Sequence, residues 1–227
     1  MRTKRLPRAV LFDLDGTLID SYDAITSSVN EVRRSRNLKP LNVSQVRPRV
    51  GRGVESLLLS TVEGTDLSVD IPLYKAHHGR ACIEQTRLLP GARELVQSLI
   101  RAGVWVGICS NKPKAFTQLI LKSLDLSDIF NVVCGPEDAS NPKPDPAMLK
   151  VAMGVLGVSA ADTLYVGDMT VDVLAGRAAE CGVWVVSTGS DSAETLRNGH
   201  PDALFEDLWE MAADLGLPDS ASYGQEI

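Results

Sequence analysis

Short apolar runs alternate with helical patterns along most of this chain, and this alternation constrains the fold more than any other feature. Apolar runs of this length predict buried strands, and they occupy residues 9–12, 104–109, 132–134, 163–166 and 183–186. Apolar residues at helical spacing lie between them at 92–102, 114–124, 146–156 and 171–179. Strands that alternate with helices form parallel sheets covered on both faces. The sequence therefore predicts an α/β fold with a Rossmann-like, doubly wound parallel sheet.

The segment from residue 20 to residue 87 interrupts this alternation. Asp20 is a predicted N-cap for a helix whose apolar residues recur at helical spacing. Further helices are predicted at 54–62 and 73–83, and no strand is predicted in the segment. We therefore expect an all-helical domain at 20–87, inserted into a core domain made of 1–19 and 88–227.

Composition and charge restrict the classes of partner. The 227 residues carry a net charge of −6, which argues against a surface that binds nucleic acid or an anionic membrane. No apolar run approaches the roughly 20 residues of a membrane helix, and the run after the basic N-terminus stops at Asp13, too early for a signal peptide. The four cysteines lack CxxC spacing and are interpreted as reduced thiols, which predicts a cytoplasmic protein.

Two aspartates follow the first predicted strand, one residue apart. Alternation along an extended chain sends Asp13 and Asp15 to the same side, and Gly16 then ends the strand. Two carboxylates about 4 Å apart repel each other by about 4 kcal/mol at an effective dielectric constant of about 20. The repulsion between the two carboxylates is therefore expected to be offset by a cation or a shared proton, unless both aspartates are solvated turn residues.

Polar residues also follow the other predicted strands. The set consists of Ser110, Asn111, Lys143, Asp168 and Asp172. The Ser110 hydroxyl and the backbone N–H groups at the start of the following helix suit a bound phosphate. The prolines that flank Lys143 fix the direction of its side chain. A helix that begins near residue 170 places Asp172 in its first turn. Taken singly, these residues also fit ordinary roles as helix starts, loop residues and caps. Together, hard oxygen ligands without His or Cys suit Mg²⁺, and Asp13 suits attack on phosphorus.

The ordered set resembles the four motifs of the haloacid dehalogenase-like hydrolase superfamily. They stand here as Asp13 to Thr17, Ser110 with Asn111, Lys143, and Gly167-Asp168 with Asp172, and the resemblance spans roughly residues 10–208. Residues 50–58, 73–78 and 86–91 are most similar to phosphoglycolate phosphatase-like members. Leu88, Leu89 and Met169 depart from that group's usual residues, and Met169 is expected to weaken the metal shell slightly.

The resemblance implies a role for each motif residue. Asp13 would be the nucleophile and a Mg²⁺ ligand. Asp15 would be the general acid and base, with its backbone carbonyl on the metal. Asp168 would bind Mg²⁺ directly, and Asp172 would support the metal shell. Phosphoryl oxygens would be held by Ser110 and Asn111, and Lys143 would neutralise charge at the phosphoryl group.

The helical segment resembles the cap that selects substrates in this superfamily. Gly51 and Gly53 would let its backbone approach the ligand closely, and Arg52 between them is a candidate for binding a substrate carboxylate. A solvated loop arginine is the alternative. His77 and His78 are expected to be exposed residues of a cap helix.

The resemblance implies a Mg²⁺-dependent phosphatase that hydrolyses a small, phosphoglycolate-like phosphate monoester through an aspartyl-phosphate. Asp15 argues against a dehalogenase and against a phosphonate hydrolase. A sugar phosphomutase of the β-phosphoglucomutase type remains open because it keeps both aspartates, and a non-catalytic binding module is a further alternative. The expected partner is a small phosphorylated metabolite, with no nucleic acid and no membrane, for a monomer or a homodimer.

Overall fold

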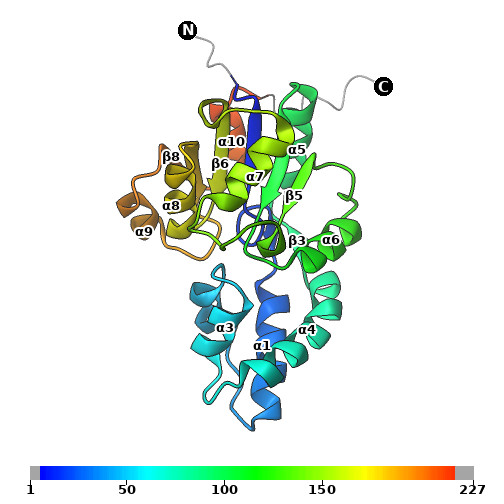
Figure 1. Cartoon of the computed structure of the whole chain (residues 1–227). Coiled ribbons are helices and arrows are strands. Elements are labelled where there is room, and N and C mark those ends of the chain that lie inside the picture. The colour runs from blue at the N-terminus through cyan, green and yellow to red at the C-terminus, as the bar shows by residue number, and fades with distance from the viewer. Residues whose placement is uncertain (1–5, 218–227) are drawn as a thin grey trace.

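A computed structural model describes residues 6–217, so the outermost residues of the predicted core, 1–5 and 218–227, lie outside the described part. Its centre is a six-stranded sheet in the order β5-β4-β1-β6-β7-β8, in which every neighbouring pair is parallel (Figure 1). The strands are β1 Ala9–Phe12, β4 Trp105–Cys109, β5 Val132–Cys134, β6 Thr163–Gly167, β7 Gly182–Val186 and β8 Ala203–Phe205.

The register of the central strands brings their carboxyl ends to one edge. Phe12, the last residue of β1, lies opposite Ile108 of β4 and Val166 of β6. All four residues of β1 are fully buried, as expected for a strand covered on both faces. Polar residues that follow β1, β4 and β6 therefore meet at the same edge of the sheet.

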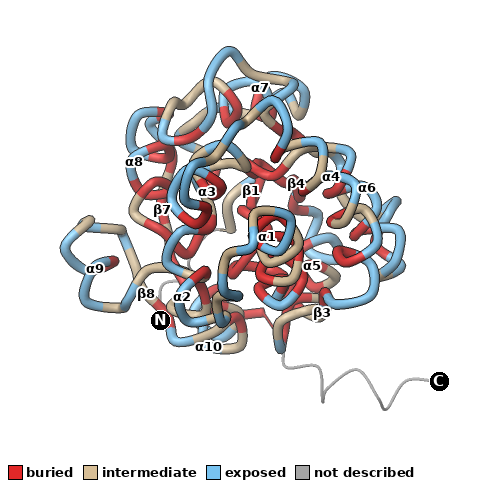
Figure 2. The backbone as a smooth tube through the Cα atoms, turned by 90° about the horizontal axis from the view of Figure 1, so that it is seen from below, coloured by how far each residue is buried: buried red, intermediate tan, exposed pale blue. Residues whose placement is uncertain are grey.

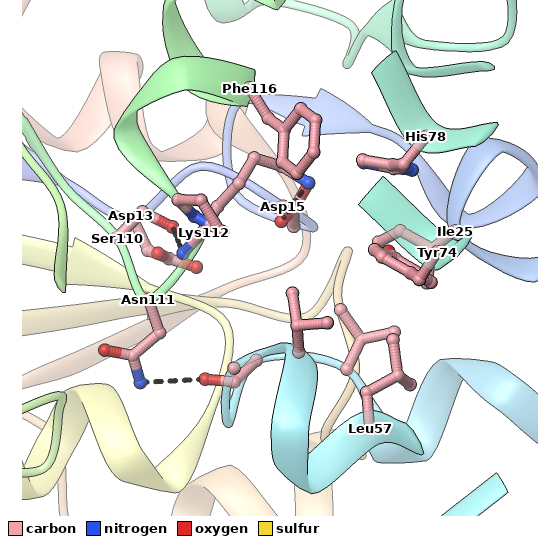
Figure 3. Close-up of a pocket in the computed structure, with 15 residues that line it drawn as sticks. Asp13, Asp15, Ile25, Leu57, Tyr74, His78, Ser110, Asn111, Lys112 and Phe116 are labelled. Atoms are coloured by element: carbon pink, nitrogen blue, oxygen red, sulfur yellow. Dashed lines mark hydrogen bonds and ion pairs between the residues drawn. The ribbon is translucent and has the colours of Figure 1, made fainter. Parts of the chain in front are cut away.

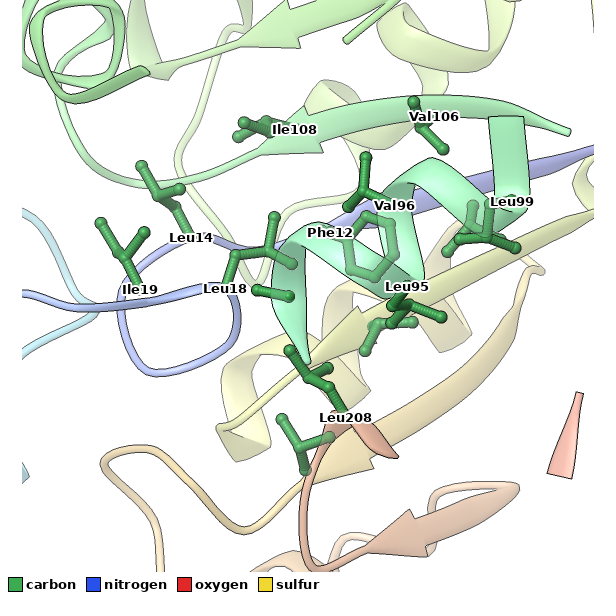
Figure 4. Close-up of a cluster of buried hydrophobic side chains, with 14 of the residues drawn as sticks. Phe12, Leu14, Leu18, Ile19, Leu95, Val96, Leu99, Val106, Ile108 and Leu208 are labelled. Carbon is green, nitrogen blue, oxygen red and sulfur yellow. The ribbon is translucent and has the colours of Figure 1, made fainter. Parts of the chain in front are cut away.

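Helices cover both faces of the sheet, so the predicted fold class is confirmed. On one face, Phe12 packs with Leu95 and Leu99 of helix α5, Ala92–Arg101 (Figure 4). On the other face, Leu11 packs with Leu149 of helix α7, Ala147–Leu156. Burial is concentrated in the strands and the inner sides of the helices (Figure 2). The helices of this part are α5 Ala92–Arg101, α6 Lys114–Ser123, α7 Ala147–Leu156, α8 Thr170–Ala178, α9 Ala193–Asn198 and α10 Leu208–Asp214, with short 3-10 turns at Pro136–Asp138 and Ala160–Asp162.

Between β1 and α5 the chain forms a helical segment, residues 21–86, beside the carboxyl ends of the strands (Figure 1). It contains α1 Tyr22–Ser35, α2 Val43–Val46, the 3-10 turn Arg47–Arg49, α3 Val54–Thr61 and α4 Leu67–Glu84. Its helices pack around a cluster of their own, which includes Val29, Leu58 and Tyr74. The predicted domain boundaries remain a prediction.

Three local expectations for this segment were wrong. Two short strands, β2 Ile19–Asp20 and β3 Arg87–Leu88, pair antiparallel at its ends, and two residues are too few to leave a sequence pattern. Ser21, not Asp20, is the N-cap position of α1, because Asp20 belongs to β2 and its carboxylate accepts the Tyr22 N–H at 3.2 Å. Helix α4 begins at Leu67 rather than residue 73, since the Asp66 side chain caps it. None of the described helices has the length and apolar character needed to cross a bilayer.

Candidate active site

Three buried carboxylates gather at the carboxyl edge of the sheet. Asp13 follows β1, Asp168 follows β6, and Asp172 lies in the first turn of α8. One oxygen from each lies within 4.8 Å of the others, and all three residues are at most 5% exposed. The sequence prediction that these residues meet is confirmed by this placement.

Lys143 lies among these carboxylates. Its Nζ is 2.7 Å from Asp13 Oδ1, 2.7 Å from Asp172 Oδ1 and 2.7 Å from the Tyr165 hydroxyl. An ammonium has three N–H donors, so Lys143 has a partner for each. Burial alone lowers the pKa of Lys143, but the Asp13 and Asp172 carboxylates outweigh burial and raise that pKa above its usual value. Lys143 therefore stays charged and offsets part of the negative charge.

One lysine does not balance the cluster. Burial, followed by the charges of Asp172 and Asp13, raises the pKa of Asp168 well above its usual value. Hydrogen bonds from Ser190 N–H and the Thr17 hydroxyl, at 2.7 Å and 3.0 Å, oppose that rise. The carboxylates thus repel one another in a buried site. Hard, closely spaced oxygen atoms with surplus negative charge fit Mg²⁺.

The Asp15 carboxylate points elsewhere. Its Oδ1 accepts a hydrogen bond from the Ser21 hydroxyl, and its Oδ2 lies 3.0 Å from Lys112 Nζ. The two aspartates of the first strand end therefore face different partners. Neither Ser21 nor Lys112 was predicted to contact Asp15, because Ser21 stands outside the motifs and Lys112 has no spacing signal of its own.

Asn111 connects three segments of the chain. Its Nδ2 donates to the Lys143 carbonyl at 3.1 Å and to the Gly51 carbonyl at 3.0 Å, and its Oδ1 accepts the Lys143 N–H at 2.8 Å. Both amide hydrogens are used in these bonds, so the side chain has none left for a phosphoryl oxygen. Asn111 thereby positions the Lys143 loop, and the Ser110 hydroxyl beside it lines the adjoining pocket.

A small pocket lies between the sheet edge and the helical segment (Figure 3). It encloses about 40 Å³, and its walls include Asp13, Asp15, Ser110 and Lys112 from the sheet side, with Gly51, Gly53, Leu57, Tyr74 and His78 from the helical segment. A cavity needs roughly 10–15 Å³ to hold one water, so the pocket has room for about three water-sized groups.

The structure does not bring Arg52 to this pocket. Arg52 is exposed and is absent from the pocket walls, whereas the backbone of its two neighbours lines them. Arg47, also in the helical segment, contacts a loop of the core rather than the pocket. Its guanidinium donates to the Gly189 and Thr188 carbonyls at 2.9 Å and 2.5 Å and lies over the Tyr22 ring at 4.6 Å. Arg47 thus joins the helical segment to the loop beside Asp168.

The expectation that His78 is exposed was wrong. His78 is 1% exposed, stacks on Tyr74 at 5.1 Å and meets Phe116 edge-on at 4.9 Å. Its Nδ1 lies 3.0 Å from the Ser28 hydroxyl. Burial, with the nearby Lys112 charge, lowers the pKa of His78 to about 2, so the imidazole is neutral. Half-buried His77 contacts the same hydroxyl at 3.1 Å; the two consecutive histidines both turn toward α1.

The Haloacid dehalogenase-like hydrolase family model matches residues 10–186. The chain therefore belongs to this family of hydrolases, which confirms the predicted family and enzyme class. Two solved structures have the same fold. A haloacid dehalogenase-like hydrolase from Streptococcus pneumoniae has a TM-score of 0.81 and 21% identity, and the match covers 92% of this chain and 98% of that one. A hydrolase from Pseudomonas syringae has a TM-score of 0.78 and 24% identity, and the match covers 92% of this chain and 98% of that one.

Within the family, the chain is similar to proteins named phosphoglycolate phosphatase, as its sequence predicted. It is 35% identical to the one from Xanthomonas campestris pv. campestris, over 92% of this chain and 98% of that protein. It is 32% identical to the one from Rhodospirillum rubrum, over 94% of this chain and 92% of that protein.

Proposed function

We propose that this protein is a Mg²⁺-dependent phosphatase that hydrolyses a small, phosphoglycolate-like phosphate monoester through an aspartyl-phosphate. The observation that carries the proposal is the buried group of Asp13, Asp168, Asp172 and Lys143, whose member Asp13 also lines a small pocket. Similarity over nearly the whole chain to proteins named phosphoglycolate phosphatase supports the substrate class.

Hydrolysis takes place in two steps. An Asp13 carboxylate oxygen attacks phosphorus, a bond forms between them, and the ester bond to the leaving oxygen breaks. Asp15 gives its proton to that oxygen. Asp15 then takes a proton from water, and the water oxygen attacks phosphorus, which releases phosphate and restores Asp13. Ser21 and Lys112 hold the Asp15 carboxylate at the pocket wall for both proton transfers.

The remaining site residues hold and neutralise charge. Bound Mg²⁺ would supply positive charge to the phosphoryl group, held by Asp13, Asp168 and the Asp15 backbone carbonyl, with Asp172 supporting this shell. Lys143 is held by Asp13 and Asp172 and keeps positive charge beside the nucleophile. The Ser110 hydroxyl and the backbone N–H of Asn111 are the proposed phosphoryl ligands.

The helical segment is the proposed cap, with a domain at 20–87 over a catalytic core of 1–19 and 88–227. Its apolar walls, including Leu57 and Tyr74, exclude water from the reacting groups. A pocket with space for about three water-sized groups suits a leaving group of few atoms. The proposed substrate is accordingly a small phosphorylated metabolite, and the proposed compartment is the cytoplasm.

A panel of phosphate esters tests this proposal. Purified protein with Mg²⁺ is incubated with phosphoglycolate, glycerol phosphate, p-nitrophenyl phosphate and a hexose 1-phosphate, and free phosphate is measured. We expect the highest kcat/KM for the smallest carboxylated ester and no activity in chelator. Conversion of the hexose phosphate to an isomer without free phosphate would instead support the phosphomutase alternative. No turnover of any ester would support the non-catalytic module.

A further inference from the structure

Two buried lysines lie at the site, and their surroundings differ. Lys143 Nζ has three partners, one for each of its N–H donors. Among residues 6–217, Lys112 Nζ has one partner, Asp15 Oδ2 at 3.0 Å. Two N–H groups of Lys112 are therefore left without a protein acceptor, although its side chain is only 4% exposed. Buried charged and polar groups in proteins usually have hydrogen-bond or ion-pair partners.

Lys112, which carries these two unpaired N–H groups, is a residue of the pocket wall. Lys112 lines the pocket together with Asp15 and Phe116, and its ammonium lies between the strand end and the helical segment (Figure 3). Asp15 already accepts a hydrogen bond from Ser21, so it does not depend on Lys112 alone. Lys112 is therefore placed to bind a ligand as well as to pair with Asp15.

The charge around the pocket identifies the chemistry of that ligand. Within the described part of the chain, Lys112 is the one lysine or arginine in the pocket wall. His78 across from it is neutral, because burial lowers its pKa to about 2, and Arg52 is exposed outside the wall. A second negative group on a substrate, separate from the phosphate, finds its only full positive charge in this pocket at Lys112.

We propose that Lys112 is a specificity-determining residue that binds the carboxylate of the leaving group. The inference rests on the proposed function and deepens it. Asp15, the proposed proton donor to the leaving oxygen, is 3.0 Å from the Lys112 ammonium. A carboxylate one carbon away from that oxygen, as in a phosphorylated 2-hydroxy acid, is thus brought within reach of the free N–H groups.

A matched pair of substrates tests this assignment. Phosphoglycolate and its carboxamide have the same shape, but only the acid carries the second charge. The measured quantity is the ratio of kcat/KM for the acid to kcat/KM for the amide. We expect a ratio of about 10 to 100 in the wild type, as for a hydrogen bond to a charged group, and a ratio near one in Lys112→Met.

Control variants separate charge from folding. Lys114→Met removes a lysine two positions further on, which pairs with Asp138 outside the pocket wall, and should leave the ratio as in the wild type. Lys112→Arg keeps the charge and should keep most of the preference. If Lys112→Met is too poorly folded to assay, Lys112→Gln gives the same comparison with a neutral donor.

The outcomes are distinguishable. Equal losses with acid and amide in Lys112→Met, which leave the ratio high, would show that Lys112 acts only through Asp15 and would overturn the inference. A wild-type ratio near one would overturn it as well, although the phosphatase proposal would stand. Failure of the wild type to hydrolyse either ester or p-nitrophenyl phosphate would overturn the proposed function itself.

Discussion

Gly189 lies where no side chain fits, and its substitution gives a sharp test of the Asp168 position. A Cβ added at Gly189 would lie 1.8 Å from Asp168 Oδ2, 2.1 Å from its Cγ and 2.2 Å from its Cβ. The Asp168 carboxyl carbon would have to move by about 1.3 Å to restore ordinary contact at 3.4 Å. Because Cβ and Cγ of Asp168 are also too close, rotation of its carboxylate alone would not remove the clash.

Gly189→Ala should therefore displace the proposed Mg²⁺ ligand. A shift of about 1 Å in such a group lowers activity by about 100-fold, and overpacking lowers the free energy of unfolding by about 1–3 kcal/mol. We expect kcat/KM for p-nitrophenyl phosphate to fall about 100-fold and half-activation to need more Mg²⁺. The assays are steady-state kinetics across a Mg²⁺ titration and urea unfolding.

Gly182→Ala is the matched control. The nearest atom to its added Cβ is 3.5 Å away, so both kcat/KM and Mg²⁺ dependence should stay close to those of the wild type. Wild-type kcat/KM and wild-type half-activation by Mg²⁺ in Gly189→Ala would refute this role of Asp168, which would then tolerate displacement or have no part in the reaction.

Two further predictions concern buried groups. Lys143→Met leaves Asp13 and Asp172 without their cation, so the free energy of unfolding measured in urea should fall by about 3–5 kcal/mol. Lys114→Met breaks a partly exposed ion pair, so its loss should be no more than about 1 kcal/mol. Equal losses in the two variants would contradict the electrostatic account. The depressed pKa of folded His78 contributes stability that is complete above the unfolded pKa near 6.5 and is lost as pH falls below it. Between pH 7.5 and 5.5, the wild type should lose about 1.4 kcal/mol more than His78→Gln, and parallel urea midpoints would contradict this.

The strands and their polar ends were predictable because one physical cause links them. Strands β1, β4 and β6 are buried on both faces and leave continuous apolar runs, and parallel pairing then aligns the residues that follow them. Asp13, Ser110 and Asp168 were therefore placed at one edge from spacing alone. The edge strand β8 was missed: its apolar run, Ala203–Phe205, has only three residues and no β-branched side chain, whereas the equally short β5 contains Val132 and Val133.

The rest of the site depends on tertiary contacts without a local pattern. Asp15 meets Lys112 and Ser21 only after the chain turns at the strand ends, and Arg47 meets the 188–189 backbone across 141 positions. His78 is buried because α4 packs against α1 and α6, which the mixed polar sequence of α4 does not reveal. These contacts set the pocket, and so substrate choice was the least predictable property.

Attack by Asp13 is the central claim, and trapping the phosphorylated enzyme tests it most directly. Protein is mixed with Mg²⁺ and a phosphate-labelled ester, quenched in acid within one turnover, and assayed for label bound to protein and for free phosphate. The account predicts bound label on the peptide containing Asp13 in the wild type and in the exposed-carboxylate control Asp23→Asn. Asp13→Asn should show no bound label and a rate at least about 1,000-fold lower. Hydrolysis by Asp13→Asn at the wild-type rate would contradict the account.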